Sequence, residues 1–331
     1  MKIRLTQLDG KLPNLALMKL AHFYRSNGAE VILTKSATRG LFEPEYDLVL
    51  GSQIFNFSTK KAETFKRNFP EAVVRGTGTD DFETVEDFLG ISEYEFYDYS
   101  DYPEFPHSIG FTQRGCRLKC SFCVVPKKEG KVRGLNTIND IWRGGGHPKQ
   151  IHLLDNDFFG QEGWKDRAEE ITQGGFEVCF NQGINVRLIH EDGASYLARM
   201  KYRDDQFKTK RIYTAWDNRR DEKVFFNGIE ILTKAGIRPN HILVYMLCGY
   251  WPNETFEDVY YRFQKMDEAK LLPYPMVYDQ ENKTLKKFQR WVVRRYYQFI
   301  TWEDYLSGKH SERELTLFHS EVEKKESEAI V

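Results

Sequence analysis

Two features are missing from this sequence of 331 residues: a long apolar run and a strong charge of one sign. No stretch approaches the roughly 20 apolar residues of a membrane-spanning helix, and the opening Met1-Lys-Ile-Arg-Leu never builds the apolar core of a signal peptide. Lysine and arginine number 48 against 49 acidic residues, so no overall field attracts a polyanion or a membrane surface. We therefore expect a cytoplasmic protein without membrane contact, in which any nucleic-acid contact is local.

Cysteine is scarce, with five in the whole chain, but three of the five share one short loop. Cys116, Cys120 and Cys123 form a CxxxCxxC spacing, whereas Cys179 and Cys248 stand alone. This distribution is typical of metal binding in a reducing compartment rather than of a disulfide scaffold. Three thiolates from one loop can occupy three corners of a [4Fe-4S] cluster, which leaves the fourth iron open to a small molecule.

Two other interpretations of the loop stay open at this point. A zinc site needs a fourth ligand, and the nearest imidazoles, His107 and His147, lie outside the usual tight spacing. A disulfide needs an even number of cysteines. The protein could therefore also be a non-catalytic iron-sulfur protein or a zinc-stabilised module that binds nucleic acid.

The first 90 residues predict a small doubly wound α/β domain. Short aliphatic runs alternate with helical patterns, of which Pro13 to Gly28 is the clearest, and this alternation favours a parallel sheet covered by helices. Residues 91–107 combine aromatic residues, acids and prolines without a period, so they predict an extended linker. The first domain would be flavodoxin-like.

Residues 108–280 predict six consecutive strand and helix units, which indicates an open, partial version of a (β/α) barrel. The predicted strands cover residues 108–113, 150–154, 177–181, 211–216, 241–247 and 273–278. In such barrels the reactive groups gather at the carboxyl ends of the strands. Residues 281–331 would form a helical extension that ends in a charge-rich tail, expected to fray beyond Ser311.

Polar residues follow the second, third and fourth of these strands. A carboxylate stabilises an ammonium group, an arginine fork matches a carboxylate, and polar groups bind ribose hydroxyls. Equally, several of these side chains could simply cap helices or form turns. The candidates are Asp155, Asn156, Asp157, Asn181, Arg187 and Asp217.

The helix predicted near the end of the chain, residues 283–297, has a basic face beside an apolar one. It is first an amphipathic helix that closes the fold. Its basic face, together with Trp291 and Tyr297, could also bind the phosphates of a nucleic acid.

The cysteine loop and the residues after the strands resemble the radical S-adenosylmethionine (radical SAM) superfamily, in the group of bacterial and phage proteins that carry a cobalamin-binding-like N-terminal domain. The resemblance rests on the stretches Phe111-Thr-Gln-Arg-Gly-Cys116, Cys120-Ser-Phe-Cys123-Val-Val-Pro126, Leu154-Asp-Asn-Asp-Phe158, Asn181-Gln-Gly-Ile-Asn-Val-Arg187 and Arg290-Trp-Val-Val-Arg294. It implies a partial (β/α)6 barrel and an enzyme that binds one [4Fe-4S] cluster and S-adenosylmethionine.

The resemblance also implies roles for particular residues. The three loop cysteines would ligate the cluster, Phe122 would pack near the adenine, and Arg187 would meet the methionine carboxylate. Reductive cleavage of S-adenosylmethionine would yield a 5′-deoxyadenosyl radical, with the electron coming from a donor such as flavodoxin or ferredoxin. The substrate and the residues that act on it stay unidentified, although a nucleotide or nucleic acid is favoured.

The N-terminal domain departs from this resemblance at two points. The cobalt-ligating pattern Asp-x-His-x-x-Gly has no counterpart, because Asp9 is followed by Gly10 and Lys11 without a histidine. A cobalamin-dependent C-methyltransferase is therefore the second choice. The segment also contains no cysteine, which argues against the methylthiotransferases, whose N-terminal domain supplies three thiolates for a second cluster.

Overall fold

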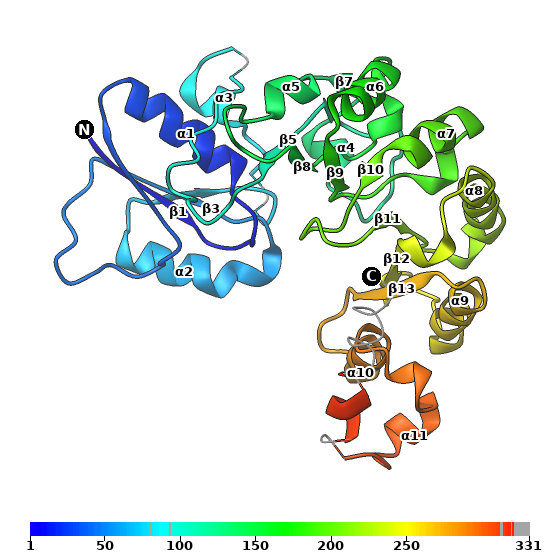
Figure 1. Ribbon diagram of the computed structural model, residues 1–331. Coiled ribbons are helices and arrows are strands. Elements are labelled where there is room, and N and C mark those ends of the chain that lie inside the picture. Colours follow the sequence, from blue (N-terminus) through cyan, green and yellow to red (C-terminus); the bar gives the residue numbers. More distant parts are fainter. Residues whose placement is uncertain (80, 93, 312–313, 319, 321–331) are drawn as a thin grey trace. The chain divides into compact units, whose positions relative to one another are not determined.

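The computed structural model describes residues 1–79, 81–92, 94–311, 314–318 and 320 of the chain. It contains two compact units, Met1–Ile109 and Gly110–Val331, each built from parallel strands and helices (Figure 1). The predicted α/β class is therefore confirmed. Most of the tail expected to fray beyond Ser311 lies outside the described residues. None of the helices in the described part of the chain has both the length and the apolar character needed to cross a lipid bilayer.

The first unit is organised around one parallel sheet in the order β2-β1-β3-β4. The strands are β1 (Lys2–Gln7), β2 (Glu30–Thr34), β3 (Leu48–Ser52) and β4 (Val73–Arg75), and the helices are α1 (Leu15–Ser26), α2 (Thr59–Asn68) and α3 (Val85–Leu89). Asn14 begins α1, because its side-chain oxygen accepts a bond from the amide of Leu17 at 3.1 Å. Ile3 and Leu5 of the central strand are fully buried, so the hydrophobic core lies against β1.

The segment predicted as a linker packs on α1 of the first unit. The described residues 94–107 contain neither helix nor strand. Lys19 of α1 forms an ion pair of 2.6 Å with Glu95, and the Arg25 guanidinium pairs with Asp98. The hydroxyl of Tyr102 donates to the side chain of Gln7 at 2.9 Å. The first compact unit consequently extends as far as Ile109.

All six strands predicted for residues 108–280 are present: two keep the predicted length but are shifted by one residue, and the other four are shorter than expected. They are β5 (Ser108–Gly110), β8 (Gln150–Leu153), β9 (Glu177–Phe180), β11 (Ile212–Ala215), β12 (Ile242–Cys248) and β13 (Leu272–Val277), and a two-residue strand, β10 (Lys201–Tyr202), is additional. The hydrogen-bonded orders are β10-β9-β8-β5 and β11-β12-β13. β5 spans the boundary between the two units.

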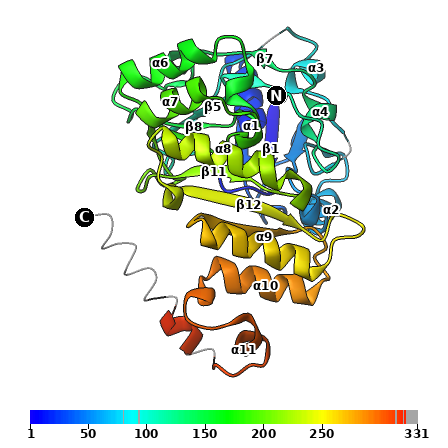
Figure 2. The same ribbon diagram turned by 90° about the vertical axis from the view of Figure 1, so that its right-hand side faces the viewer.

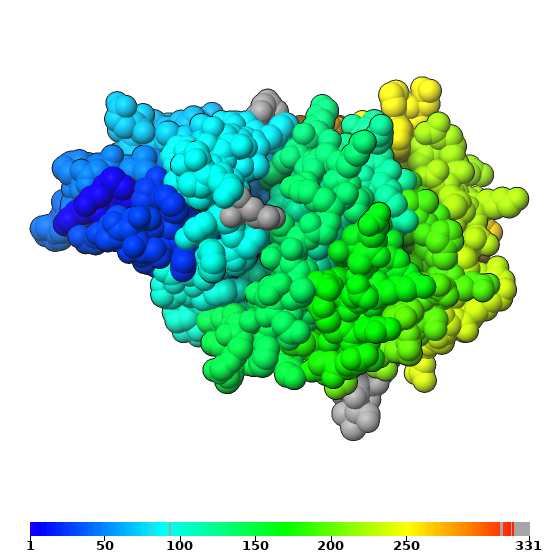
Figure 3. All heavy atoms as spheres, turned by 90° about the horizontal axis from the view of Figure 1, so that it is seen from above, coloured from blue at the N-terminus to red at the C-terminus, as the bar shows by residue number. Residues whose placement is uncertain are grey.

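Helices cover one side of these strands. They are α6 (Trp164–Gly174), α7 (Glu191–Arg199), α8 (Glu222–Lys234), α9 (Phe256–Glu268) and α10 (Lys283–Val293), and α11 (Trp302–Leu306) packs on α10. Figure 2 shows α6 to α10 following one another in chain order, from green to orange. On the face in Figure 3, the colours of the second unit likewise change steadily from green to yellow, as expected for neighbouring β/α units. The core between strands and helices includes Ile151, Val178, Val244 and Phe288.

The predicted strand 108–113 is interrupted, and this corrects the sequence-based expectation. β5 ends at Gly110, and Gln113–Arg114 forms a separate strand, β6, that pairs antiparallel with β7 (Arg133–Gly134). The interruption has a local cause, because the amide and hydroxyl of Thr112 bond to the carboxyl group of Asp155 instead of a neighbouring strand. Between β6 and β8 the chain forms two short helices, α4 (Val125–Lys128) and α5 (Ile138–Ile141).

Candidate active site at the cysteine loop

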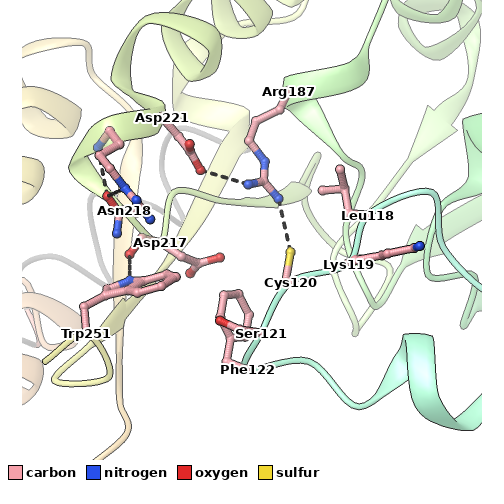
Figure 4. A pocket seen from close by; sticks show the side chains of 11 residues that line it. Leu118, Lys119, Cys120, Ser121, Phe122, Arg187, Asp217, Asn218, Asp221 and Trp251 are labelled. Atoms are coloured by element: carbon pink, nitrogen blue, oxygen red, sulfur yellow. Dashed lines mark hydrogen bonds and ion pairs between the residues drawn. The ribbon is translucent and has the colours of Figure 1, made fainter.

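A cavity of about 380 Å³ lies at the carboxyl edge of the second unit, meaning the loops that follow its parallel strands (Figure 4). One wall is the cysteine loop, and the other walls follow β9, β11 and β12. The volume falls within the range of small-ligand pockets. The lining residues are Leu118, Lys119, Cys120, Ser121, Phe122, Arg187, Asp217, Asn218, Arg220, Asp221 and Trp251.

Arg187 projects into this cavity from the short 3₁₀ turn Val186–Leu188 after β9. One terminal nitrogen donates to Asp221 at 2.9 Å, and the other lies 3.7 Å from the sulfur of Cys120 (Figure 4). Burial lowers the pKa of the guanidinium, but the sulfur and Asp221 outweigh that effect, so the pKa is raised. The predicted cation therefore faces a loop cysteine.

Asp217 follows β11 and is held by hydrogen bonds from β12 and from the loop that follows it. Its carboxylate accepts the amide of Leu247 at 3.0 Å, and its carbonyl accepts the indole N–H of Trp251 at 2.8 Å. Burial raises the pKa of Asp217 above its usual range. Since one carboxylate oxygen has a backbone partner and the residue lines the cavity, the second oxygen can accept a bond from a ligand.

Three aromatic rings meet at the other side of the cavity. The ring of Phe122 packs edge-to-face against Tyr250 at 5.5 Å and against Trp251 at 6.3 Å between centroids. The hydroxyl of Tyr250 bonds to Ser121 at 3.2 Å. Phe122 and Trp251 give the cavity an apolar wall suited to a planar ring.

The loop itself is held by Glu129, a residue that we did not predict. Its carboxylate accepts bonds from the amide of Gly115 at 2.9 Å, the side chain of Asn156 at 2.8 Å and the guanidinium of Arg114 at 2.9 Å. Gly115 has φ +82°, and a Cβ there would lie 2.3 Å from the carbonyl oxygen of Lys131. Only glycine fits this turn, which begins the cysteine loop.

Asp157 anchors the loop from the other direction. It is 1 % exposed and forms a bidentate pair with Arg117, inside the CxxxC spacing, at 2.7 and 2.9 Å. The side-chain oxygen of Gln113 accepts the amides of Asn156 and Asp157 at 3.1 and 3.3 Å. A bidentate arginine pair fixes orientation as well as distance. The segment after β8 therefore holds the cysteine loop in place through these hydrogen bonds.

Asp155 and Asn181 are also occupied by internal contacts. The buried carboxyl group of Asp155 bonds to Thr112 and to the amide of Gln113, and burial raises its pKa to about 7. The side-chain oxygen of Asn181 lies 3.1 Å from a ring nitrogen of His152. Of the predicted site residues, the structure brings Cys120, Phe122, Arg187 and Asp217 to the cavity wall. Its lining does not include the other predicted residues, Cys116, Cys123, Asp155, Asn156, Asp157 and Asn181.

The three loop thiols belong to the surface of the second unit rather than to its core. They are partly exposed, and the amide of Leu118 donates to the sulfur of Cys116 at 3.4 Å. Burial raises the pKa of Cys116 and of Cys123, with a further contribution from the neighbouring cysteines. Among the described residues, no three His, Cys, Asp or Glu side chains converge as ligands of one metal ion. In a cubane cluster each thiolate binds a different iron, so convergence on a single point is not required.

No family model matches the chain. One curated relative is a tRNA-2-methylthio-N(6)-dimethylallyladenosine synthase from Sulfurihydrogenibium sp. (strain YO3AOP1), which is 29% identical over 164 residues. The match covers 44% of this chain and 37% of the relative, so the chain spans little more than a third of that protein's length. This similarity supports placement in the radical SAM superfamily, to which the methylthiotransferases compared above belong.

Proposed function

We propose that the protein is a radical SAM enzyme whose cluster loop is Cys116, Cys120 and Cys123. The observation that carries the proposal is the cavity in which this loop faces a guanidinium, a carboxylate and an aromatic wall. When bound, a [4Fe-4S] cluster would supply the electron that splits S-adenosylmethionine into methionine and a 5′-deoxyadenosyl radical. The electron would come from a donor such as flavodoxin or ferredoxin.

The residues around the cavity would bind and orient S-adenosylmethionine. The fork of Arg187 would hold the methionine carboxylate, Asp217 would accept bonds from the ribose hydroxyls, and Phe122 would pack on the adenine. The side chains of Asp155 and Asp157 already have partners, so their segment would meet the methionine ammonium through backbone carbonyls. Asn181 would not touch S-adenosylmethionine itself and would instead support the segment after β9 that lines the cavity.

The finer fold that accompanies this function is a flavodoxin-like first domain followed by a partial (β/α)6 barrel. The all-parallel order β2-β1-β3-β4 supports the first part. The six successive parallel strands with their helices support the second. In both, ligands are expected at the carboxyl edge of the strands.

Cobalamin has no place in this proposal, because the described residues of the first unit do not fit it. The carboxylate of Asp9, at the position of the cobalt-binding pattern, accepts the amides of Ile54 and Phe55 at 2.8 and 2.9 Å. His22 lies on α1, where a ring nitrogen contacts the hydroxyl of Tyr94 at 2.6 Å. The position of the cobalt-binding pattern therefore carries no histidine, and the carboxylate of Asp9 is already paired within the unit.

RNA is the substrate class that we favour, because helix α10 carries an exposed basic stripe. The helix contains no acidic residue, and its exposed positions recur every three or four residues. The stripe consists of Lys283, Lys286, Lys287, Arg290 and Arg294. Trp291, which we expected beside it, is 2 % exposed and packs in the core, so it cannot stack on a base. The name of the curated relative, a tRNA-modifying synthase, agrees with this choice.

Anaerobic assay tests the enzymatic proposal. Reconstituted protein should hold about four iron atoms per chain, and dithionite with S-adenosylmethionine should release 5′-deoxyadenosine. Protein that carries a full cluster but yields no 5′-deoxyadenosine would contradict the proposal. A zinc module would instead bind zinc and lack iron-sulfur colour.

Salt-dependent RNA binding tests the substrate class separately. The triple variant Lys283→Gln, Lys286→Gln, Lys287→Gln should bind tRNA more weakly, with a slope of log K against log salt reduced by up to about 3. The matched variant Lys60→Gln, Lys61→Gln, Lys66→Gln removes three exposed lysines from α2 and should bind like wild type. An equal slope in both variants would remove α10 from the RNA interface.

A further inference from the structure

An ion pair with almost no exposed side-chain surface lies beside the ends of β11 and β12. Arg262 of α9 has no exposed surface, and a terminal nitrogen lies 2.5 Å from Glu254, whose side chain is 6 % exposed. Burying two charges is costly, and apolar residues of similar volume often give equal or greater stability. The pair therefore calls for an explanation other than stability.

The guanidinium ties together the ends of two neighbouring strands. One terminal nitrogen donates to the carbonyl of Trp216, just after β11, at 2.8 Å. The other donates to the carbonyl of Leu247, near the end of β12, at 2.9 Å. The fixed fork of an arginine sets the separation of these two carbonyls more tightly than a flexible lysine would.

Glu254 extends the connection to the loop that follows β12. Its second oxygen accepts the amide of Gly249 at 2.6 Å, and Gly249 has the positive φ of +79° that turns the chain. The loop closed in this way carries Trp251, whose indole bonds to the carbonyl of Asp217. Asp217 in turn accepts the amide of Leu247. Arg262 and Glu254 are thus connected by hydrogen bonds to the ends of β11 and β12 and to the loop that carries Trp251.

We propose that Arg262 and Glu254 are positioning residues for this cavity: they hold the ends of β11 and β12 so that Asp217 and Trp251 face the ligand. The inference rests on the proposed function in taking S-adenosylmethionine as that ligand. Neither residue lines the cavity, so the effect passes through the two strand ends. Their charges are retained for geometry, and the core would tolerate apolar replacements.

The first unit supplies a matched control. Arg4 is also buried, lies 2.5 Å from Glu43 and donates to the carbonyls of Ser36 and Thr38 at 2.8 and 3.3 Å. Glu43 likewise accepts a glycine amide, that of Gly40, at 2.7 Å. The two pairs share their chemistry, but all contacts of the Arg4 pair named here lie within the first unit.

The test compares Arg262→Met, Glu254→Leu with Arg4→Met, Glu43→Leu. Equilibrium binding of S-adenosylmethionine to reconstituted protein should weaken on the order of 100-fold in the first double variant and stay within about twofold of wild type in the second. Amide exchange measured without ligand should be faster over residues 247–254 in the first variant alone. The single variant Arg262→Lys keeps the charge without the fork and should lose affinity to an intermediate degree.

Wild-type affinity in the Arg262 double variant, or equal losses in both double variants, would overturn the inference while the proposed function stands. Wild-type protein that holds its cluster but does not bind S-adenosylmethionine would overturn the proposed function, and this positioning role with it. If the double variant does not fold, Arg262→Lys with wild-type affinity and wild-type exchange over 247–254 is the overturning result.

Discussion

The parallel strands of the two units end in different ways at their carboxyl edges. In the first unit, polar groups at this edge form hydrogen bonds with other protein groups. The carboxylate of Asp9 accepts two backbone amides, and the side-chain amide of Gln53 donates to the carbonyl of Phe55 at 2.9 Å. Loops also close the edge, since a Cβ on Gly76 would lie 2.3 Å from the carbonyl oxygen of Gln53. In the second unit a thiol, a guanidinium and a carboxylate face one cavity.

This difference teaches that the α/β layout provides a place for chemistry without providing the chemistry. Both edges have the same local architecture, a parallel strand followed by a loop. What distinguishes them is which side chains the loops carry and whether those side chains are already satisfied. Changes at matched positions of the two edges should therefore have very different consequences.

The largest effect is expected at the loop cysteines. Cys120→Ala should abolish the cluster, because two thiolates of one loop hold it poorly, and iron content should fall from about four atoms per chain to near zero. Cys248→Ala is the matched control, since that thiol is fully buried in the core and donates to the carbonyl of Met246. Full iron content in Cys116→Ala, Cys120→Ala and Cys123→Ala alike would refute the ligand assignment.

The next effect is expected from a comparison of two arginines near strand ends, Arg187 and Arg75. Arg187→Lys should slow S-adenosylmethionine cleavage roughly 100-fold, because a lysine cannot reproduce the bidentate fork. Arg75, the last residue of β4, pairs with Asp81 at 3.0 Å at the edge of the other sheet. Cleavage rates measured for Arg75→Lys should match wild type, and a similar loss in both variants would erase the distinction between the two edges.

A smaller effect is expected from the pH dependence of Asp155. Its pKa is raised to about 7 in the folded chain, so below that pH the carboxyl group is mainly protonated in the folded chain and ionises more readily on unfolding. The stability that it contributes is complete below the unfolded pKa of about 4 and is lost as pH rises through 7, by at most roughly 4 kcal/mol. Asp155→Asn, which mimics the neutral acid, should reduce the change of the melting temperature with pH between pH 5 and 8. An unchanged pH profile would show that Asp155 ionises freely.

The smallest effect is expected at the closed edge of the first unit. Asp9→Ala leaves the amides of Ile54 and Phe55 without their carboxylate partner and should lower the free energy of unfolding by about 2 kcal/mol. Denaturant titration measures this loss. Iron content and S-adenosylmethionine cleavage should stay at the wild-type level, and a fall in either would give the first sheet a part in the chemistry.

The sequence predicts much of this architecture because periodic signals are local. The apolar runs locate the six strands of the second unit, and CxxxCxxC marks the loop that borders the cavity. The basic stripe of α10 is also readable from spacing alone, although the burial of Trp291 is not, because a tryptophan between two faces of a helix can turn either way. Arg187 and Asp217 could be found because each follows a predicted strand, and functional side chains of such barrels gather after the carboxyl ends of strands.

The supports of the site could not be predicted, because they depend on contacts between segments far apart in the chain. Glu129 reaches back 14 residues to Gly115, and Asp157 pairs with Arg117 across 40 residues. Nothing in the sequence separates these carboxylates from the many that face solvent. The sequence identifies the acidic stretch after β8 as a candidate for ligand binding. In the structure its side chains bind the cysteine loop and residues on either side of it, and only the fold shows these contacts.

The position of β5 has a practical consequence for dissecting the protein. The division between the compact units falls between Ile109 and Gly110, inside this strand, and Ser108 and Ile109 are essentially inaccessible to solvent. A truncation at the division itself would remove two buried residues from the strand that leads into the cysteine loop. An autonomous catalytic fragment, if one is to be expressed, must therefore start upstream of Ser108, within the irregular segment that packs on α1.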